Sequence, residues 1–327
     1  MLTLIQPPAS VSWLAPVAWV PFIYMALTAG SMKKTMLLSY LIGLVYWFSN
    51  LYWLTYVARP GYVAFCMYLA LYWPVLVFAL RVLRGKRAFF FLTCALLIVG
   101  AEKWQGILIT GFNWRFLAHS QWKNLPLIQI ADIFGAAGVS MLLALINTLL
   151  ADLLCELKER RKITPAPALA KSALVVFCLI ASLVYGRFRL EQTQRNTRPG
   201  PVLGSVQPNI PSYVRELSEN GPQILRDVLE ISSEAFSAGA VLVAWPETVV
   251  LASMNSDYLK LCDPHSYPRV YDRAIKTHVK HHGGYLLFGA HAANMEQSQN
   301  GYNVLERFNA AYLYRPDGKQ DEKRYDK

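Results

Sequence analysis

Apolar residues crowd into residues 10–186 of this 327-residue chain, whereas the residues from 187 onward read like a water-soluble α/β segment. A helix needs roughly 20 mostly apolar residues to cross a bilayer. Six stretches are predicted to cross a membrane: Val11–Ala29, Thr35–Val57, Tyr62–Leu80, Ala88–Thr110, Leu125–Leu154 and Leu169–Tyr185. The fifth is longer than a crossing needs, which indicates a tilted or broken helix. Residues 1–186 are therefore expected to form a transmembrane bundle of about six helices.

The pattern changes after residue 186. Residues 187–200 are polar and are predicted to form a linker, and residues 201–327 alternate between short apolar runs and amphipathic stretches. The expected strands are Val202–Val206, Ala240–Trp245, Tyr285–Gly289, Ala310–Tyr314 and Asp321–Asp326, and the expected helices are 219–239 and Tyr267–His282. Strands that alternate with helices and end in a hairpin indicate an α/β domain. The chain should therefore combine a multi-pass α-helical bundle with an α/β domain.

The charge distribution supports a membrane topology rather than nucleic-acid binding. The net charge is +11, but the basic residues sit in short clusters between apolar segments. Basic clusters of this kind mark cytoplasmic loops. They fall in the first, third and fifth loops, as Lys33 and Lys34, then Arg81, Arg84, Lys86 and Arg87, then Lys158, Arg160, Arg161 and Lys162. Six crossings would then place the α/β domain on the opposite side, the periplasm of a double-membrane bacterium, with the bundle in the inner membrane.

One carboxylate stands where α/β domains concentrate their chemistry. Trp245-Pro246-Glu247 lies at the carboxyl end of an apolar strand, and sites gather at such strand ends. The adjacent Trp245 and Pro246 would shield the Glu247 carboxylate partly from water. Such desolvation would raise the pKa of Glu247 and suit it to general-base catalysis. The alternative interpretation is an ordinary surface glutamate at a strand end.

The other chemically suggestive residues carry weaker signals. His278, His281 and His282 share one helix face, but they occupy the last turn, where the helix dipole favours imidazolium, so no metal site is predicted. The five cysteines, Cys66, Cys94, Cys155, Cys178 and Cys262, have no metal-binding spacing. Polar residues in or near the apolar segments, Glu102, Lys103, Asp132 and Asn147, are expected to be structural.

Seven segments together resemble the bacterial apolipoprotein N-acyltransferases, which are membrane members of the nitrilase superfamily. The first three are Leu14–Trp19, Ile107–Trp114, and Pro126–Gln129 followed by Phe134-Gly135; the other four are Val206–Pro211, Trp245–Glu247, Phe308–Ala310 leading to Pro316–Lys319, and Tyr325–Lys327. The resemblance covers nearly the whole chain. It implies that residues 201–327 are the first part of a nitrilase-like α-β-β-α sandwich.

The resemblance also implies a mechanism with a Glu-Lys-Cys triad. By motif, the general base is Glu247 and the lysine that stabilises the oxyanion is Lys327, while Trp245 and Asn309 are expected to bind substrate. A cysteine would form a thioester with an acyl chain from a phospholipid and pass it to the amino group of a diacylglyceryl-cysteine lipoprotein. No metal or organic cofactor is implied, and the partners are these two lipid-anchored substrates and membrane lipids.

The sequence departs from the family pattern in several places. The nucleophilic cysteine of the family lies well after the position of Lys327, and Cys262 is a poor substitute because it lies between Glu247 and the next helix. Asn113 replaces a frequent proline and Ala310 a frequent serine. The family also has one more apolar helix at each end, so the chain is expected to be trimmed before the catalytic cysteine and to be inactive as given.

Two alternatives stay open at this point. One is a membrane-tethered amidase of the nitrilase superfamily, which would share Glu247 and Lys327 but act on a soluble amide. The other is a non-catalytic membrane protein, either a truncated remnant or a transporter-like bundle. A transporter should show internal repeats or broken helices with paired polar residues, and the sequence has neither.

Overall fold

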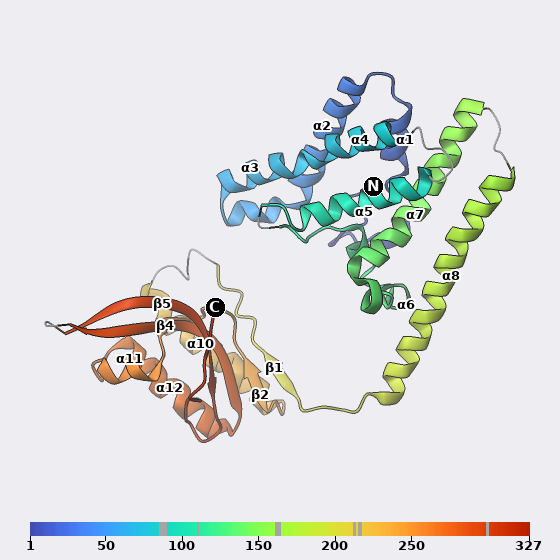
Figure 1. Ribbon diagram of the computed structural model, residues 1–327. Coiled ribbons are helices and arrows are strands. Elements are labelled where there is room, and N and C mark those ends of the chain that lie inside the picture. Colours follow the sequence, from blue (N-terminus) through green and yellow to red (C-terminus); the bar gives the residue numbers. More distant parts are fainter. Residues whose placement is uncertain (85–89, 110, 161–164, 212–213, 215–217, 299–300) are drawn as a thin grey trace. The chain divides into compact units, whose positions relative to one another are not determined.

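The computed structural model describes the chain except for residues 85–89, 110, 161–164, 212–213, 215–217 and 299–300 (Figure 1). The chain forms two compact units, Met1–Thr197 and Arg198–Lys327, which are described separately. Four of the loop charges used to predict topology, Lys86, Arg87, Arg161 and Lys162, lie outside the described residues.

Met1–Thr197 contains helices and no strand among its described residues, with turns and irregular segments at its N-terminus and after α5 (Figure 1). Its main helices are α1 (Val20–Thr28), α2 (Met32–Asn50), α3 (Arg59–Ala70), α4 (Tyr72–Leu83), α5 (Phe90–Gln105), α6 (Leu125–Ile128), α7 (Ala131–Arg160) and α8 (Pro165–Asn196). Short 3-10 helices cover Ser12–Leu14, Tyr52–Tyr56 and Leu117–Gln121.

Three helical stretches of the described chain are long and apolar enough to span a membrane: Arg59–Leu83, Ala131–Glu159 and Pro165–Asn196. They match the third, fifth and sixth predicted segments. In the first predicted segment, α1 has only 9 residues. Its second residue is Pro21, which cannot donate a backbone hydrogen bond and so is confined to the first turn of a helix. In the second predicted segment, α2 carries Lys33 and Lys34 in its first turn and is less apolar than the three candidate spans. In the fourth, α5 covers 16 residues.

Two further expectations about the helices are resolved. The long fifth segment is broken, because α6 and α7 are separate helices and Gly135 inside α7 has a non-helical backbone (φ 63°, ψ −171°). The segment 187–200, expected to be a linker, is helical up to Asn196 as the end of α8. It contains no proline or glycine before Pro199, and an Arg195–Glu191 ion pair joins positions one turn apart (3.4 Å).

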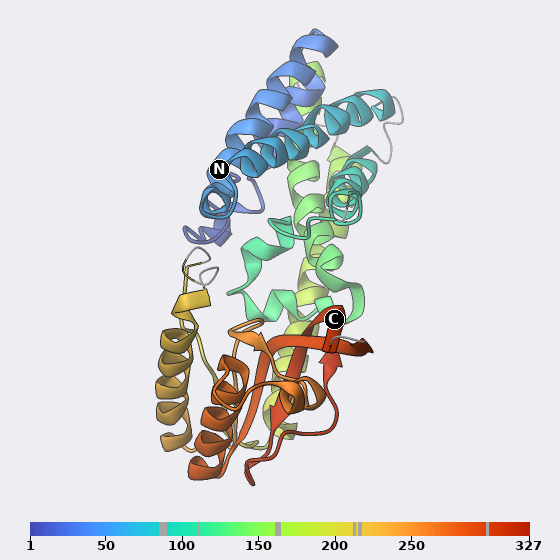
Figure 2. The ribbon, with the colours of Figure 1, turned by 90° about the vertical axis from the view of Figure 1, so that its left-hand side faces the viewer.

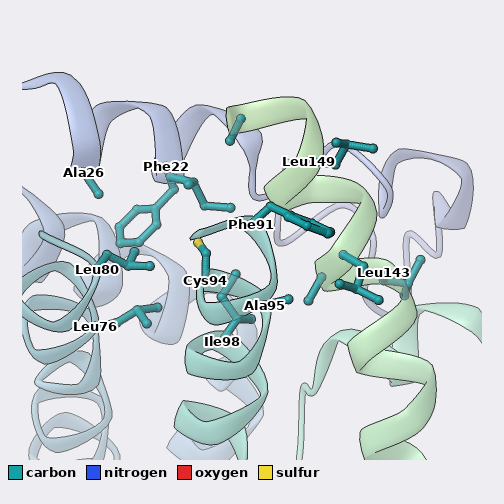
Figure 3. Close-up of a cluster of buried hydrophobic side chains, with 14 of the residues drawn as sticks. Phe22, Ala26, Leu76, Leu80, Phe91, Cys94, Ala95, Ile98, Leu143 and Leu149 are labelled. Atoms are coloured by element: carbon teal, nitrogen blue, oxygen red, sulfur yellow. The ribbon is translucent and has the colours of Figure 1, made fainter. Parts of the chain in front are cut away.

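The core of the helical unit is formed by side chains of α1, α4, α5 and α7 (Figure 3). Leu76 and Leu80 of α4 and Ile98 of α5 are each no more than 6% exposed. Trp19 and Trp73 stack with their ring centroids 5.3 Å apart. These contacts hold α4 beside α5.

Arg198–Lys327 contains one six-stranded mixed sheet, with strand order β1-β2-β4-β5-β6 and with β3 paired to β4. The strands are β1 (Leu203–Ser205), β2 (Leu242–Ala244), β3 (Val250–Ser253), β4 (Tyr285–Ser298), β5 (Gly301–Tyr314) and β6 (Tyr325–Asp326). β1, β2 and β3 run parallel to their neighbours, whereas β5 is antiparallel to both β4 and β6. The predicted combination of a helical membrane part with an α/β part is found.

The helices α10 (Gly221–Ser237) and α12 (Tyr267–His282) contact each other and the sheet, and both cover the same face of it (Figure 2). Alternate residues of β4, namely Leu286, Phe288, Ala290 and Ala292, are buried beneath them, as strand geometry requires. The short helix α11 (Ser256–Leu261) follows β3. The predicted helix Tyr267–His282 is confirmed to the residue.

Two features of the sheet differ from the prediction. β3 was not predicted, and β4 and β5 form a hairpin of 14 residues each instead of two short strands. The outer half of this hairpin is polar, with Asn294, Glu296 and Glu306, so it lacks the apolar run that identified the inner half. The last expected strand is reduced to Tyr325–Asp326, because Pro316-Asp317-Gly318 and the residues after it form turns.

Histidine titration should make the α/β unit sensitive to acid. Burial, and then the nearby His282 and His281, lower the pKa of His278 from 6.5 to about 4. Between these values the unfolded chain binds a proton that the folded chain does not, so stability should fall as the pH drops from about 6.5 toward 4. This neutral His278 contrasts with the imidazolium expected at a helix end.

The expected outcome is faster hydrogen exchange of α12 at pH 5 than at pH 7 in the full chain, after correction for intrinsic exchange rates. His278→Leu should reduce this difference, whereas His265→Leu, an exposed control, should leave it unchanged. An equal difference in wild type and His278→Leu would contradict the assignment.

A candidate active site where strand β2 ends

Trp245 fixes the turn that follows β2. Its backbone N–H donates to the Leu287 carbonyl of β4 (2.8 Å), which extends the parallel pairing by one residue. Its indole N–H donates to the Ser232 hydroxyl of α10 (2.5 Å), and its ring packs near Phe288. The side chain is only 6% exposed. Trp245, expected to bind substrate, therefore lies in the core and positions Glu247 two residues later.

Gly289 of β4 lets the turn pack closely against the sheet. A Cβ built at residue 289 would lie 2.6 Å from the Thr248 nitrogen and 2.7 Å from the Glu247 Cα. Both neighbours are backbone atoms, which cannot move aside as a flexible side chain can. Thr248 itself has a positive φ of 52°, a strained conformation for a β-branched residue. The sheet and the turn thus hold Glu247 in one place.

Asn309 of β5 joins the parts of the site. Its side-chain N–H donates to Glu247 Oε1 (2.5 Å). Its side-chain oxygen accepts a hydrogen bond from the Thr248 hydroxyl (3.0 Å). Its main-chain carbonyl accepts a hydrogen bond from the Lys327 N–H (2.9 Å). One residue therefore uses its side chain to orient the carboxylate and its backbone to place the lysine.

Lys327 completes the arrangement. β6 pairs with β5 in the register Ala310↔Asp326 and Ala311↔Tyr325, which carries the following residue to the side of Asn309. The Lys327 Nζ donates to Glu247 Oε1 at 3.0 Å. Glu247 and Lys327, separated by 80 positions in the sequence, thus meet in space, and the same carboxylate oxygen accepts from both Lys327 and Asn309.

The site is open to solvent in this chain. The side chains of Lys327 and Glu247 are 71% and 61% exposed. Trp245, expected to shield Glu247 from water, turns into the core, and the carboxylate side chain stays largely exposed. An exposed ion pair contributes little to stability, so the folding energy of the unit does not explain why the two groups meet.

The remaining candidates lie apart from this arrangement. Cys262 follows the end of α11, and its thiol lies near the Tyr258 hydroxyl. His291 is the cross-strand partner of Asn309; burial, and then the positive charge of Arg307, lower its pKa. No group of three or more His, Cys, Asp or Glu side chains able to hold a metal occurs among the described residues.

Gly289 and Thr248 are the parts of the site that the sequence did not reveal. Gly289 ends an apolar run and was expected only as the last residue of a strand. The positive φ of Thr248 has no sequence signature. The only available signal was the position of Gly289 at the same strand end as Trp245-Pro246-Glu247.

Comparison with known proteins gives a consistent result. Residues 1–149 match the model of a family described as the apolipoprotein N-acyltransferase N-terminal domain. An apolipoprotein N-acyltransferase of Geobacter metallireducens is 30% identical over 255 residues, which is 72% of this chain and 47% of that protein. Apolipoprotein N-acyltransferase 1 of Treponema denticola is 24% identical over 319 residues, 92% of this chain and 57% of that protein.

A third relative, from Bradyrhizobium diazoefficiens and also named apolipoprotein N-acyltransferase, is 29% identical over 202 residues, 60% of this chain and 36% of that protein. The chain thus spans about half the length of the curated relatives that it matches. The match extends from the helical unit into the unit that carries Glu247 and Lys327, since the alignment with the Treponema relative covers 92% of this chain.

Replacement of Gly289 should disturb the site specifically. Gly289→Ala places a methyl group against the backbone of residues 247 and 248, and relief of such overpacking costs about 1–3 kcal/mol. Hydrogen exchange in the segment 245–250 of the full chain should therefore accelerate. Gly200→Ala is the matched control, because a Cβ at that position meets nothing within 4 Å. Unchanged exchange in both variants would show that the turn does not pack on Gly289.

Proposed function

Because the chain belongs to the apolipoprotein N-acyltransferase family, we propose that it serves the transfer of an acyl chain from a phospholipid to the amino group of an S-diacylglyceryl-cysteine lipoprotein. The observation that carries the proposal is the 3.0 Å contact between Lys327 Nζ and Glu247 Oε1, with Asn309 bound to the same oxygen. Glu247 acts as general base and Lys327 stabilises the oxyanion.

In the first half-reaction, Glu247 takes the proton of a cysteine thiol, and the thiolate attacks the ester carbonyl carbon of the phospholipid. The ammonium group of Lys327 stabilises the negative charge on the tetrahedral oxygen. The carbon–oxygen ester bond then breaks, and the lysophospholipid alcohol leaves with the proton from Glu247. The acyl chain remains on sulfur as a thioester, as in other covalent acyl-transfer enzymes.

In the second half-reaction, the lipoprotein amino group attacks the thioester carbonyl. Glu247 accepts a proton from the attacking nitrogen and returns it to the departing thiolate, so an amide forms and the thiol is regenerated. Each proton leaves and returns through the same carboxylate, and no net charge is created. Asn309 is a positioning residue, because its amide holds Glu247 Oε1 at 2.5 Å.

The nucleophilic thiol of this scheme is not one of the five cysteines. Cys66, Cys94, Cys155 and Cys178 belong to the helical unit, and Cys262 follows α11 beside Tyr258. The family resemblance assigns the nucleophile to a cysteine that comes later than Lys327 in sequence. The proposal therefore assigns two members of the triad, Glu247 and Lys327, to these 327 residues. It also includes a second sheet that packs on the first in a nitrilase-like sandwich.

We further propose that the α/β unit faces the periplasm from a multi-pass inner-membrane bundle. Three helical stretches long and apolar enough to cross a membrane support the membrane location. The basic clusters at the start of α2 and the end of α7, with Lys33, Lys34 and Lys158, support the orientation. Both substrates are lipid-anchored, so attachment to the bilayer keeps the pair where its substrates are.

A chimera tests the catalytic roles. Residues 1–327 would be joined to the remaining C-terminal part of the Geobacter relative, and acyl transfer from phospholipid to a diacylglyceryl peptide would be measured. We expect activity in the chimera and none in residues 1–327 alone. Glu247→Gln should lower kcat by about 10²–10⁴-fold, and Lys327→Met should lower it by about 10²–10³-fold.

The matched controls are Glu322→Gln and Lys323→Met, which alter exposed residues of the same segment and should retain full activity. The thiol of the folded chimera would be titrated first, so that a misfolded protein is not scored as inactive. A chimera with a reactive thiol whose activity survives Glu247→Gln would refute the proposal. Transfer by residues 1–327 alone would refute the assignment of the nucleophile.

Orientation is tested by chemical labelling in cells. In a Cys262→Ser background, Lys280→Cys on the exposed face of α12 should react with a membrane-impermeant maleimide in intact spheroplasts. Lys34→Cys, in the first turn of α2 and in the first basic cluster, should react only after lysis. Reversed labelling of the two positions would place the α/β unit in the cytoplasm and contradict the proposed topology.

A further inference from the structure

One residue next to the proposed active site has no role in the mechanism described above: His291 of β4, in the long hairpin of Figure 1. Ala290 and Ala292, on either side of it, are 0% exposed beneath α10 and α12. Successive residues of a strand point to opposite faces, so His291 points to the other face of the sheet, here called the outer face. Leu287 of the same strand is 39% exposed on this face.

His291 belongs to a row of polar residues that crosses the sheet. Its partner in β3 is Ser253, and its partner in β5 is Asn309. Asn309 binds Lys327 through its main-chain carbonyl (2.9 Å) and Glu247 through its side-chain amide (2.5 Å). Directly opposed residues of antiparallel strands share a face, with Cβ atoms about 4.5–5.5 Å apart. His291 therefore borders the residue that joins the catalytic pair.

Arg307 brings a positive charge to the same part of the outer face. It lies two residues before Asn309 in β5, so both side chains point to that face. It is the diagonal cross-strand neighbour of His291, about 7–8 Å away, a distance that a long side chain spans. The Arg307 side chain is exposed, and within the described part of the chain no ion pair engages it. After burial, the Arg307 charge is the second cause that lowers the pKa of His291.

The nearby carboxylates do not neutralise this charge. Glu306 points to the opposite face of β5 by strand alternation. Asp326 opposes the buried Ala310 and forms an ion pair with Arg324 (2.8 Å). Glu247 lies on the far side of Asn309 and already accepts from it. This part of the outer face therefore attracts an anion, which would also relieve the repulsion between the guanidinium and a protonated imidazole.

The donor of the proposed reaction carries an anion close to its reacting bond. In a glycerophospholipid, the glycerol carbons link the ester that is broken to a phosphodiester with a single negative charge. Two residues of β5 separate Asn309 from Arg307, about 7 Å along the strand, which is a span that the glycerol part bridges. A guanidinium binds two phosphate oxygens at once, and an imidazole N–H donates to a third acceptor position.

We propose that Arg307 and His291 bind the phosphate of the phospholipid donor while its ester carbonyl lies at Glu247 and Lys327. The inference rests on the proposed function for the identity of the donor. The two residues take no part in bond breaking; they determine specificity, because a neutral diacylglycerol would leave the guanidinium without a partner. The Ser253 hydroxyl, beside His291 in the same row, is a further donor within this site.

The test measures binding to the full chain in maltoside micelles and needs no acyl transfer. The probe is dihexanoylphosphatidylcholine, and the broadening of its phosphorus NMR line beyond that in empty micelles gives a Kd across a titration. Dihexanoylglycerol, the same lipid without phosphate, should not displace the probe. Inorganic phosphate, the anion without lipid, should displace it less than an equal concentration of dihexanoylphosphatidylethanolamine does.

Two substitutions locate the site. Arg307→Gln should raise the Kd by about 10- to 100-fold, as expected for loss of hydrogen bonds to a charged group, and His291→Leu by up to about tenfold. Arg307→Lys keeps the charge and should bind the probe more tightly than Arg307→Gln. Arg226→Gln is the matched control, because Arg226 is an exposed arginine of α10, which covers the other face of the sheet, and it should leave the Kd unchanged.

Equal Kd values in Arg307→Gln and Arg226→Gln would overturn the proposal. Displacement by dihexanoylglycerol would mean apolar binding only, and displacement by inorganic phosphate as strong as by the lipid would mean a general anion site; both results would contradict a phospholipid site. The outcome is separate from that of the proposed function. An inactive chimera with intact, Arg307-dependent binding would contradict the catalytic roles and support this assignment.

Discussion

In the α/β unit, the meeting of Glu247 and Lys327 depends on one residue, Asn309 of β5, which forms hydrogen bonds with both. Its side chain holds the Glu247 carboxylate and the Thr248 hydroxyl, and its backbone carbonyl holds Lys327. A carboxylate from the end of β2 and an amine from the end of β6 therefore share one location. Without this residue the two charged groups would be exposed side chains on separate loops, and their attraction in water alone would be too weak to keep them together.

The close packing of the turn after β2 also holds Glu247 in place. Trp245 is bound into the core through Ser232, and Gly289 permits the backbone of residues 247 and 248 to touch β4. Rigid elements on both sides of the Glu247 carboxylate hold it in one place, which is the condition that the proposed general base requires.

The sequence predicted the elements that have strong local patterns. α12 was correct to the residue because a glycine follows a regular amphipathic repeat, and the existence of β2 and the inner part of β4 followed from short apolar runs. Glu247 was found as a candidate because it follows a buried strand, and Lys327 only through the family resemblance. Their contact is a long-range pairing, which no local pattern encodes.

The features that were missed depend on tertiary packing or on weak patterns. The outer half of the β4–β5 hairpin is polar and has no apolar run, and β3 is only four residues long. The role of Gly289 depends on a backbone that arrives from 42 positions away.

The contact between Glu247 and Lys327 is tested most directly by zero-length carbodiimide crosslinking of the full chain, followed by peptide mass spectrometry. A nitrogen 3.0 Å from a carboxylate oxygen predicts an amide crosslink that joins the peptides containing residues 247 and 327. Lys260 and Asp257, which are 3.1 Å apart and similarly exposed, provide an internal reference. A crosslink at the reference pair without one between residues 247 and 327 would contradict the account.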